Sequence, residues 1–156
     1  MPCSGRNTVI GSLFKGAEGD MDDRLRERIL KKISEEPFAR KMGLRLIQVD
    51  EGYALVEMTV DDSLLNLFGT VHGGAIFSLI DGAFEAASNS HGTVAVAVNL
   101  NVTYTAPAKP GSILRAEAKE IHLGGRTATY DIRVTDLEGT LIAVCHALVY
   151  RKNIPL

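Results

Sequence analysis

The most apolar segment of the chain is residues 73–90, which read GGAIFSLIDGAFEAASNS. Its apolar side chains recur at helical spacing and cover most of the circumference of a helix: Ala75, Ile76, Leu79, Ile80, Ala83, Phe84 and Ala87. A helix that is apolar nearly all round lies in the interior of a protein. The segment therefore predicts a long central helix that the rest of the chain must cover.

Downstream of this helix the apolar period changes to two, which is the period of a β-strand. We expect strands at 93–105, 112–122, 126–136 and 140–151, each separated from the next by turn residues. The segment 140–151 is apolar on both faces, which predicts a strand that is buried on both sides.

Upstream of the central helix the pattern predicts three further segments. Residues 22–36 carry one apolar stripe among charged side chains and predict an amphipathic helix that Pro37 ends. Residues 44–60 predict a hairpin with its turn at residues 50–52. Residues 1–20 are rich in Gly and show no sustained period, so we interpret them as a flexible N-terminal extension.

The order of elements is therefore helix, two strands, central helix and four strands. A sheet with one apolar face and a helix that needs cover pack economically against each other. We predict an α+β fold in which a five- to six-stranded antiparallel sheet wraps around the long central helix. Because the whole chain has 156 residues, we expect residues 21–156 to form a single domain.

Composition and motifs argue against several classes of function. The formal net charge is -2, so no excess of Lys and Arg is available to bind nucleic acid. The sequence shows neither metal-ligand spacing nor a nucleotide-binding glycine motif, so we expect no metal and no cofactor. No apolar run is long enough to span a membrane, and the distant Cys3 and Cys145 predict no disulfide framework. We therefore expect a cytoplasmic protein.

Asp81 is the first candidate for catalysis, because it lies among apolar and small residues of the central helix. Burying a bare charge costs several kcal/mol, so such a carboxylate must be paired, hydrogen-bonded or functional. Glu85 follows one turn later, and repulsion between the two carboxylates raises their proton affinity, as suits a general base near neutral pH. The alternative is a polar seam that faces solvent or a subunit interface.

His72-Gly73-Gly74 stands where the preceding loop becomes the helix. Free backbone N–H groups at a helix start can bind the oxygen of a thioester carbonyl as it becomes negative under attack. The glycines can instead serve only to shape the turn. Asn66, in the same loop, could orient water or a carbonyl, although Asn in loops mostly caps backbone groups.

Together these residues resemble the signature of the PaaI-like hotdog-fold acyl-CoA thioesterases, in the spacing Asn66-x-x-Gly69-x-x-His72-Gly73-Gly74-x-x-Phe77-x-Leu79-x-Asp81. The resemblance covers most of residues 35–151. It implies a hotdog fold that hydrolyses aryl- or medium-chain acyl-CoA without a metal. It also implies a homodimer with active sites at its interface, commonly paired again into a homotetramer.

The resemblance further implies roles for single residues. Asp81 would be the catalytic carboxylate, as general base or nucleophile, and Gly73 would supply the N–H that binds the thioester oxygen. Asn66 and His72 would position the thioester or the water from the opposite subunit. Some relatives carry a hydroxyl side chain near Asn99, so the residue that positions water stays open. The substrate-binding residues that we expect are Gly74, Phe77, Asn99 and Arg126, the last as a partner for the phosphates of coenzyme A.

Two other functions on the same fold stay open. A non-catalytic acyl-CoA-binding regulatory protein need not keep a carboxylate in the central helix, and it usually carries an added effector domain. A hydratase or dehydratase needs a His and an acid around the α- and β-carbons of the acyl group, and the sequence shows no such motif. The thioesterase is therefore the favoured interpretation.

Overall fold

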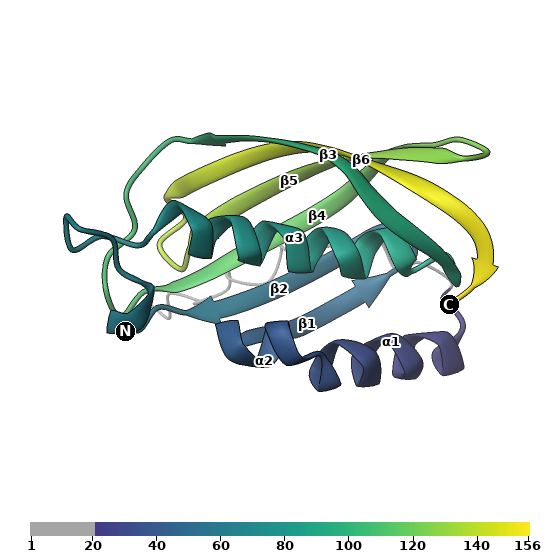
Figure 1. Cartoon of the computed structure of the whole chain (residues 1–156), viewed down its shortest axis with the longest axis horizontal. Coiled ribbons are helices and arrows are strands. Elements are labelled where there is room, and N and C mark those ends of the chain that lie inside the picture. Colours follow the sequence, from purple (N-terminus) through teal and green to yellow (C-terminus); the bar gives the residue numbers. More distant parts are fainter. Residues whose placement is uncertain (1–20) are drawn as a thin grey trace, which may run out of the picture.

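Figure 1 shows one long helix lying across a curved antiparallel sheet in the computed structural model, which describes residues 21–156. The helix is α3 (Gly73–Asn89), and its bounds match the predicted central helix to within one residue. The α+β hotdog fold is thereby confirmed. Residues 1–20, which we interpreted as a flexible extension, lie outside the described residues.

The sheet has six strands in the order β1-β2-β4-β5-β6-β3, and every neighbouring pair is antiparallel. The strands are β1 (Leu44–Asp50), β2 (Tyr53–Thr59), β3 (Thr93–Tyr104), β4 (Ile113–Leu123), β5 (Thr127–Asp136) and β6 (Leu141–Pro155). The last strand runs four residues beyond the predicted end, because Pro155 still pairs with Thr93 at the start of β3. β3 and β1 are the two edges of this sheet.

Two helices precede the sheet and lie beside β1 (Figure 1). α1 (Asp23–Glu35) begins after Asp22, whose carboxylate accepts the backbone N–H groups of Arg24 and Leu25. The predicted end of the helix at Pro37 is confirmed, since a new short helix, α2 (Pro37–Met42), begins there. Within α1, Ile29 is buried against Val49 of β1.

The core lies between α3 and the concave face of the sheet. Phe84 of α3 is 1% exposed and meets the ring of Tyr130 of β5 edge to face, with centroids 5.3 Å apart. Alternate residues of β2, β4, β5 and β6 point at the helix and are buried, so the period-two pattern of these strands marks the core face.

One face of α3 has little cover from residues 21–156, and we call it the open face. It consists of residues spaced three or four apart that are half-buried or exposed: Gly74, Phe77, Ser78, Asp81, Gly82 and Glu85. The prediction of a helix covered on every side is therefore wrong for one chain. The prediction that β6 is buried on both faces is wrong for the same reason, since His146 and Tyr150 on its outer face are exposed.

A buried polar cluster closes the C-terminal end of α3. His91 lies between two carboxylates, with Nε2 2.6 Å from Glu120 Oε2 and Nδ1 3.2 Å from Glu51 Oε1. The Tyr130 hydroxyl donates to the same Glu120 oxygen at 2.7 Å. These residues come from four different segments, so the cluster fixes the β1–β2 turn and the end of α3 onto β4 and β5.

We expect Gly52→Ala to cost more stability than Gly43→Ala. Both glycines have left-handed backbone angles, φ +69° and +67°, so an alanine is strained by about 1 kcal/mol at either site. A Cβ on Gly52 would also lie 2.9 Å from Cβ of Glu120, whereas one on Gly43 would meet nothing within 4 Å. The extra loss should be about 1–3 kcal/mol in urea unfolding. Equal losses of unfolding free energy at the two sites would show that Glu120 can move away from the added methyl group at little cost.

Candidate active site

Asp81 lies in the middle of the open face of α3 and is half-buried. Burial raises the pKa of its carboxyl group above the ordinary value for an aspartic acid. Among residues 21–156 no side chain or backbone group forms a hydrogen bond or ion pair with it. A partly desolvated carboxylate without a partner is a better base than one in water, and it is free to meet a substrate.

Glu85 lies one turn beyond Asp81 on the same face. Desolvation, repulsion from Glu36 at the end of α1 and repulsion from Asp81 raise the pKa of Glu85 to about 7. The pKa of Asp81 is raised by burial alone, whereas the negative charge of Asp81 is itself one of the causes that raise the pKa of Glu85. The two carboxylates on this face therefore influence each other's ionisation.

We expect Glu85→Gln to stabilise the protein at pH 8 and to change little at pH 4. The folded chain holds the Glu85 proton more tightly than the unfolded chain, so ionisation destabilises the fold as pH rises from about 4.5 to about 7. Because the Glu85 side chain is exposed to solvent in the single chain, water screens its charge, and the loss of unfolding free energy should be about 1 kcal/mol or less. Thermal unfolding at the two pH values measures it, and an equal shift at both would contradict the assigned cause.

His72 is the residue that caps the start of α3. Its ring Nδ1 accepts the backbone N–H of Gly74 at 2.8 Å. The ring nitrogen that can donate to a ligand is therefore Nε2. The N–H of Gly74 is occupied by this cap, which leaves the neighbouring Gly73 N–H as the donor for a ligand.

Gly73 is the first residue of α3, and no acceptor for its N–H occurs among the described residues. Its carbonyl accepts the Tyr104 hydroxyl at 3.0 Å, and a Cβ would lie 3.3 Å from the Tyr104 ring. Asp81 is eight residues further along, which is about 12 Å at the rise of an α-helix. One carbonyl carbon cannot lie about 3 Å from both groups, so the two cannot serve the same thioester within one chain.

Asn66 organises the loop that leads into α3. Its amide donates to Thr70 Oγ1 at 2.9 Å, while its oxygen accepts the N–H groups of Phe68 and Thr70. Both ends of the side chain are thus used within the loop, as Asn commonly is. The loop presents Leu67 and Phe68 at its tip, 88% and 80% exposed. Two such apolar side chains on an exposed tip are typical of a contact with another chain.

The structure brings together some of the predicted substrate-binding residues and separates others. Gly74 and Phe77 share the open face with Asp81. Asn99 pairs with Leu148 and points to the opposite side of β3 from Leu100, which packs on the core, so it lies away from Asp81. The Arg126 guanidinium donates to the Tyr150 hydroxyl at 3.3 Å, roughly 17 Å along β6 from Cys145.

Sequence reasoning missed two neighbours of the candidate site. Tyr104 joins the start of α3 to β3 through its hydrogen bond to the Gly73 carbonyl. Cys145 of β6 is the second neighbour: burial, the charge of Asp131 and then the charge of Asp81 raise the pKa of its thiol to about 11. Both contacts join residues far apart in sequence. Only the position of Tyr104 within a strand after the helix could have suggested one of them.

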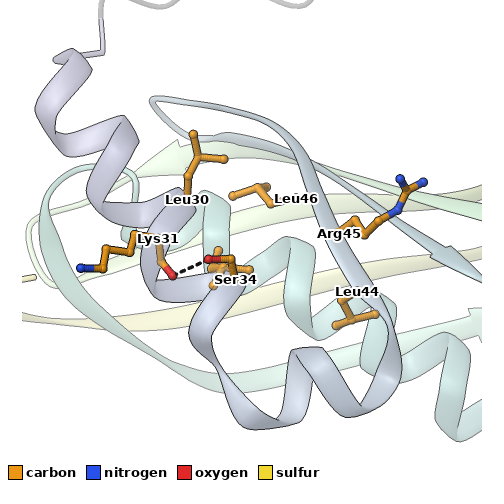
Figure 2. A pocket seen from close by; sticks show the side chains of 7 residues that line it. Leu30, Lys31, Ser34, Leu44, Arg45 and Leu46 are labelled. Carbon is orange, nitrogen blue, oxygen red and sulfur yellow. Dashed lines mark hydrogen bonds between the residues drawn. The ribbon is translucent and has the colours of Figure 1, made fainter.

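Two cavities lie beside α1. Figure 2 shows the larger, about 550 Å³, which lies between α1 and β1 and is lined by Leu30, Lys31, Ile33, Ser34, Leu44, Arg45 and Leu46. None of these residues is a carboxylate, and the Ser34 hydroxyl is engaged with the Lys31 carbonyl (Figure 2). The smaller, about 280 Å³, includes Glu85 of the open face and is lined by Ile29, Lys32, Ile33, Glu85, Ala86, Asn89, Val94, Ala95, Val96 and Leu156.

The described part of the chain contains neither a cluster of metal-binding side chains nor a membrane-spanning helix. No group of three or more His, Cys, Asp or Glu side chains there could hold a metal ion. None of its helices is both long and apolar enough to cross a bilayer. The candidate chemistry is therefore that of the Asp81 carboxylate and the backbone at the start of α3.

Comparison with known proteins places this site in a family. A family model described as the Thioesterase superfamily matches residues 68–143. Acyl-coenzyme A thioesterase PaaI of Escherichia coli is 37% identical over 113 residues, which are 72% of this chain and 81% of PaaI. Acyl-coenzyme A thioesterase 13 of Homo sapiens is 32% identical over 127 residues, 79% of this chain and 91% of the relative.

Solved structures agree with the sequence comparison. The Escherichia coli PaaI protein from the phenylacetic acid degradation operon matches with a TM-score of 0.83 at 31% identity, covering 86% of this chain and 98% of PaaI. A Streptococcus mutans protein bound to acetyl CoA matches with a TM-score of 0.70 at 26% identity, covering 72% of this chain and 91% of that one.

The central helix and the six-stranded sheet, together with the thioesterase relatives, define a hotdog hydrolase that acts on thioesters. Within that class, the chain belongs to the PaaI-like thioesterases of the thioesterase superfamily. The resemblance first noted in the spacing from Asn66 to Asp81 is thereby confirmed at the level of the family.

Proposed function

We propose that this protein hydrolyses acyl-coenzyme A thioesters, with aryl or medium-chain acyl groups, to the free acid and coenzyme A. The observation that carries the proposal is the Asp81 carboxylate, half-buried and without a partner on the open face of α3. The similarity to PaaI and to acyl-coenzyme A thioesterase 13 supports the acyl-CoA substrate, as does the relative that was solved with acetyl CoA.

The active site is completed by a second copy of the chain. Asp81 and the Gly73 N–H are about 12 Å apart along one helix, so the N–H that meets the thioester beside Asp81 comes from the partner. Three exposed features would be covered in such a homodimer: the open face of α3, the edge strand β3 and the apolar loop tip at Leu67 and Phe68. Two homodimers pair into a homotetramer, which light scattering in solution tests.

In the proposed reaction, Asp81 acts on the carbonyl carbon of the thioester, either by taking a proton from attacking water or by attacking directly. The carbonyl oxygen becomes negative and is held by the partner's Gly73 at the positive end of its helix. The carbon–sulfur bond then breaks, and coenzyme A leaves as a thiolate that takes up a proton. In the first route the attacking water supplies the second oxygen of the acid. In the second route the acyl group is first left as a mixed anhydride with the Asp81 carboxylate, and a water molecule then hydrolyses this anhydride to release the acid and restore Asp81.

Other side chains have supporting roles in this proposal. His72 uses Nδ1 to cap the helix, and its Nε2 can donate to the thioester or to water. Asn66 acts by holding the loop that places Gly73, because both ends of its amide are already bonded there. Arg126 is proposed as a phosphate partner of coenzyme A, and Arg126→Ala should raise KM without lowering kcat.

A thiol-release assay tests the proposal. Purified protein is incubated with phenylacetyl-CoA and with straight-chain acyl-CoAs, and free coenzyme A is measured with a thiol reagent. We expect turnover on at least one of them. Tight acyl-CoA binding without turnover would favour a regulatory protein, and conversion of an enoyl-CoA to the hydroxyacyl-CoA would favour a hydratase. Either result would overturn the proposed function.

A further inference from the structure

The smaller cavity continues the open face of α3 beyond Asp81. Figure 1 shows that α1 and the start of β3 both lie near the C-terminal end of α3. The cavity of about 280 Å³ lies where these three elements meet. Glu85, which shares the open face with Asp81, forms part of its wall. The cavity is therefore the next space along the helix from the proposed reaction centre.

Seven of the ten residues that line this cavity are apolar, which suits hydrocarbon, and the others are Lys32, Glu85 and Asn89. Side chains from all three elements supply it, with Ile33 from α1, Ala86 from α3 and Val94 from β3. The amide of Asn89 presents no unmet polar group, since it donates to the Glu85 carbonyl and accepts the Ala95 N–H. A volume just below the range of about 300–1,000 Å³ for whole ligands fits part of a substrate.

The position of the cavity sets the length of chain that can reach it. Glu85 and Asn89 are four and eight residues beyond Asp81, which is about 6 and 12 Å along the helix. An extended chain advances about 1.2 Å per bond, as an extended polypeptide does. If the carbonyl carbon lies at Asp81 and counts as the first carbon, roughly the sixth carbon reaches the entrance and the eleventh would reach the far end.

We propose that this cavity between α1, α3 and β3 binds the distal half of a straight acyl chain of about eight to ten carbons. The inference rests on the proposed function and deepens it, because it selects a medium-length alkanoyl group over an aryl group as the substrate class. Burial of each further methylene group stabilises the bound substrate, so the rate constant kcat/KM rises with chain length until the cavity is full.

Val94 is the residue at which the cavity can best be altered. Val94 lies at an irregularity between Thr93 and Ala95, the two neighbouring residues of β3 that pair with β6. A change of its side chain should therefore leave the pairing of the two strands intact. Val94→Phe should narrow the cavity and Val94→Ala should widen it. The matched control is Leu30→Phe, which adds an aromatic ring to the larger cavity shown in Figure 2. No residue of α3 lines that cavity.

The measured quantity is the ratio of kcat/KM for decanoyl-CoA to that for butyryl-CoA. We expect Val94→Phe to lower this ratio by about tenfold or more, the scale of discrimination by a few methylene groups. Val94→Ala should move the best substrate to a longer chain, which keeps the test open if the Phe variant does not fold. Leu30→Phe should leave the ratio as it is in the wild type.

Two outcomes separate failure of the cavity from failure of the function. Hydrolysis of acyl-CoA with the same chain-length profile in wild type and both Val94 variants would overturn the cavity and leave the thioesterase intact. An equal change of the ratio in Leu30→Phe would also overturn it. Lack of hydrolysis of every acyl-CoA by the wild type would remove the thioesterase and this inference together.

Discussion

Asp81→Asn is expected to lower kcat/KM for acyl-CoA by about a hundredfold or more, the scale of a lost general base. Asparagine has nearly the same shape as aspartate, but it can neither accept a proton from water nor attack a carbonyl carbon. The substitution should not destabilise the fold, because the carboxylate has no described partner and its burial already opposes ionisation. Steady-state kinetics and thermal unfolding of the same preparation measure both effects.

Asp131→Asn is the matched control for this substitution. Asp131 is a carboxylate of β5 that lies near Arg133 and His146, both of them exposed, on the outer side of the sheet. Its loss should leave kcat/KM within about twofold, because it is remote from the open face of α3. Full activity in Asp81→Asn and in Asp81→Ala would remove the proposed mechanism, whatever the control shows.

Phe84→Ala is expected to cost about 3–5 kcal/mol of unfolding free energy, which is a large part of the stability of a domain of this size. Phe84 is almost fully buried, and its ring meets the edge of Tyr130 at the centre of the interface between α3 and the sheet. The cavity left behind cannot collapse easily, because α3 touches all six strands of the sheet. Urea unfolding monitored by circular dichroism measures the loss.

Phe38→Ala serves as the reference, since Phe38 of α2 is 50% exposed and buries much less area. We expect it to cost about 1 kcal/mol or less. If the two substitutions had similar costs, the core would not be centred on the contact between α3 and β5.

Elements with strong local patterns were predictable from the sequence. The apolar run from Ala75 to Ala87 gave α3, and the alternation along residues 126–136 gave β5, because burial of one face imposes its period on the sequence. The same logic failed at the open face of α3, where Phe77 is exposed beside small and charged residues such as Gly82 and Glu85. A helical apolar pattern marks the residues that can be buried and does not show which neighbour covers each of them.

The candidate site was predictable in its parts but less so in its geometry. The spacing from Asn66 to Asp81 led to the family, and an unpaired carboxylate in a helix led to Asp81. The role of Asn99 stays a prediction: it faces the side of β3 opposite to Leu100, and an irregularity between Ala97 and Asn99 that the sequence does not reveal shifts the pairing of this strand. The cluster around His91 left no local signal, since its members meet only in the folded chain.

The separation of Gly73 from Asp81 on one rigid helix has a consequence for mixtures of two inactive variants of the protein. Proline is tolerated at the first position of a helix and lacks an N–H, so Gly73→Pro removes the donor. In the proposed two-fold homodimer, each pocket combines Asp81 of one chain with Gly73 of its partner. When an Asp81→Asn chain pairs with a Gly73→Pro chain, one pocket therefore contains both substitutions and the other pocket contains neither. Two inactive preparations, unfolded together in equal amounts and refolded, would then regain about a quarter of wild-type activity, because half of the random pairs are mixed.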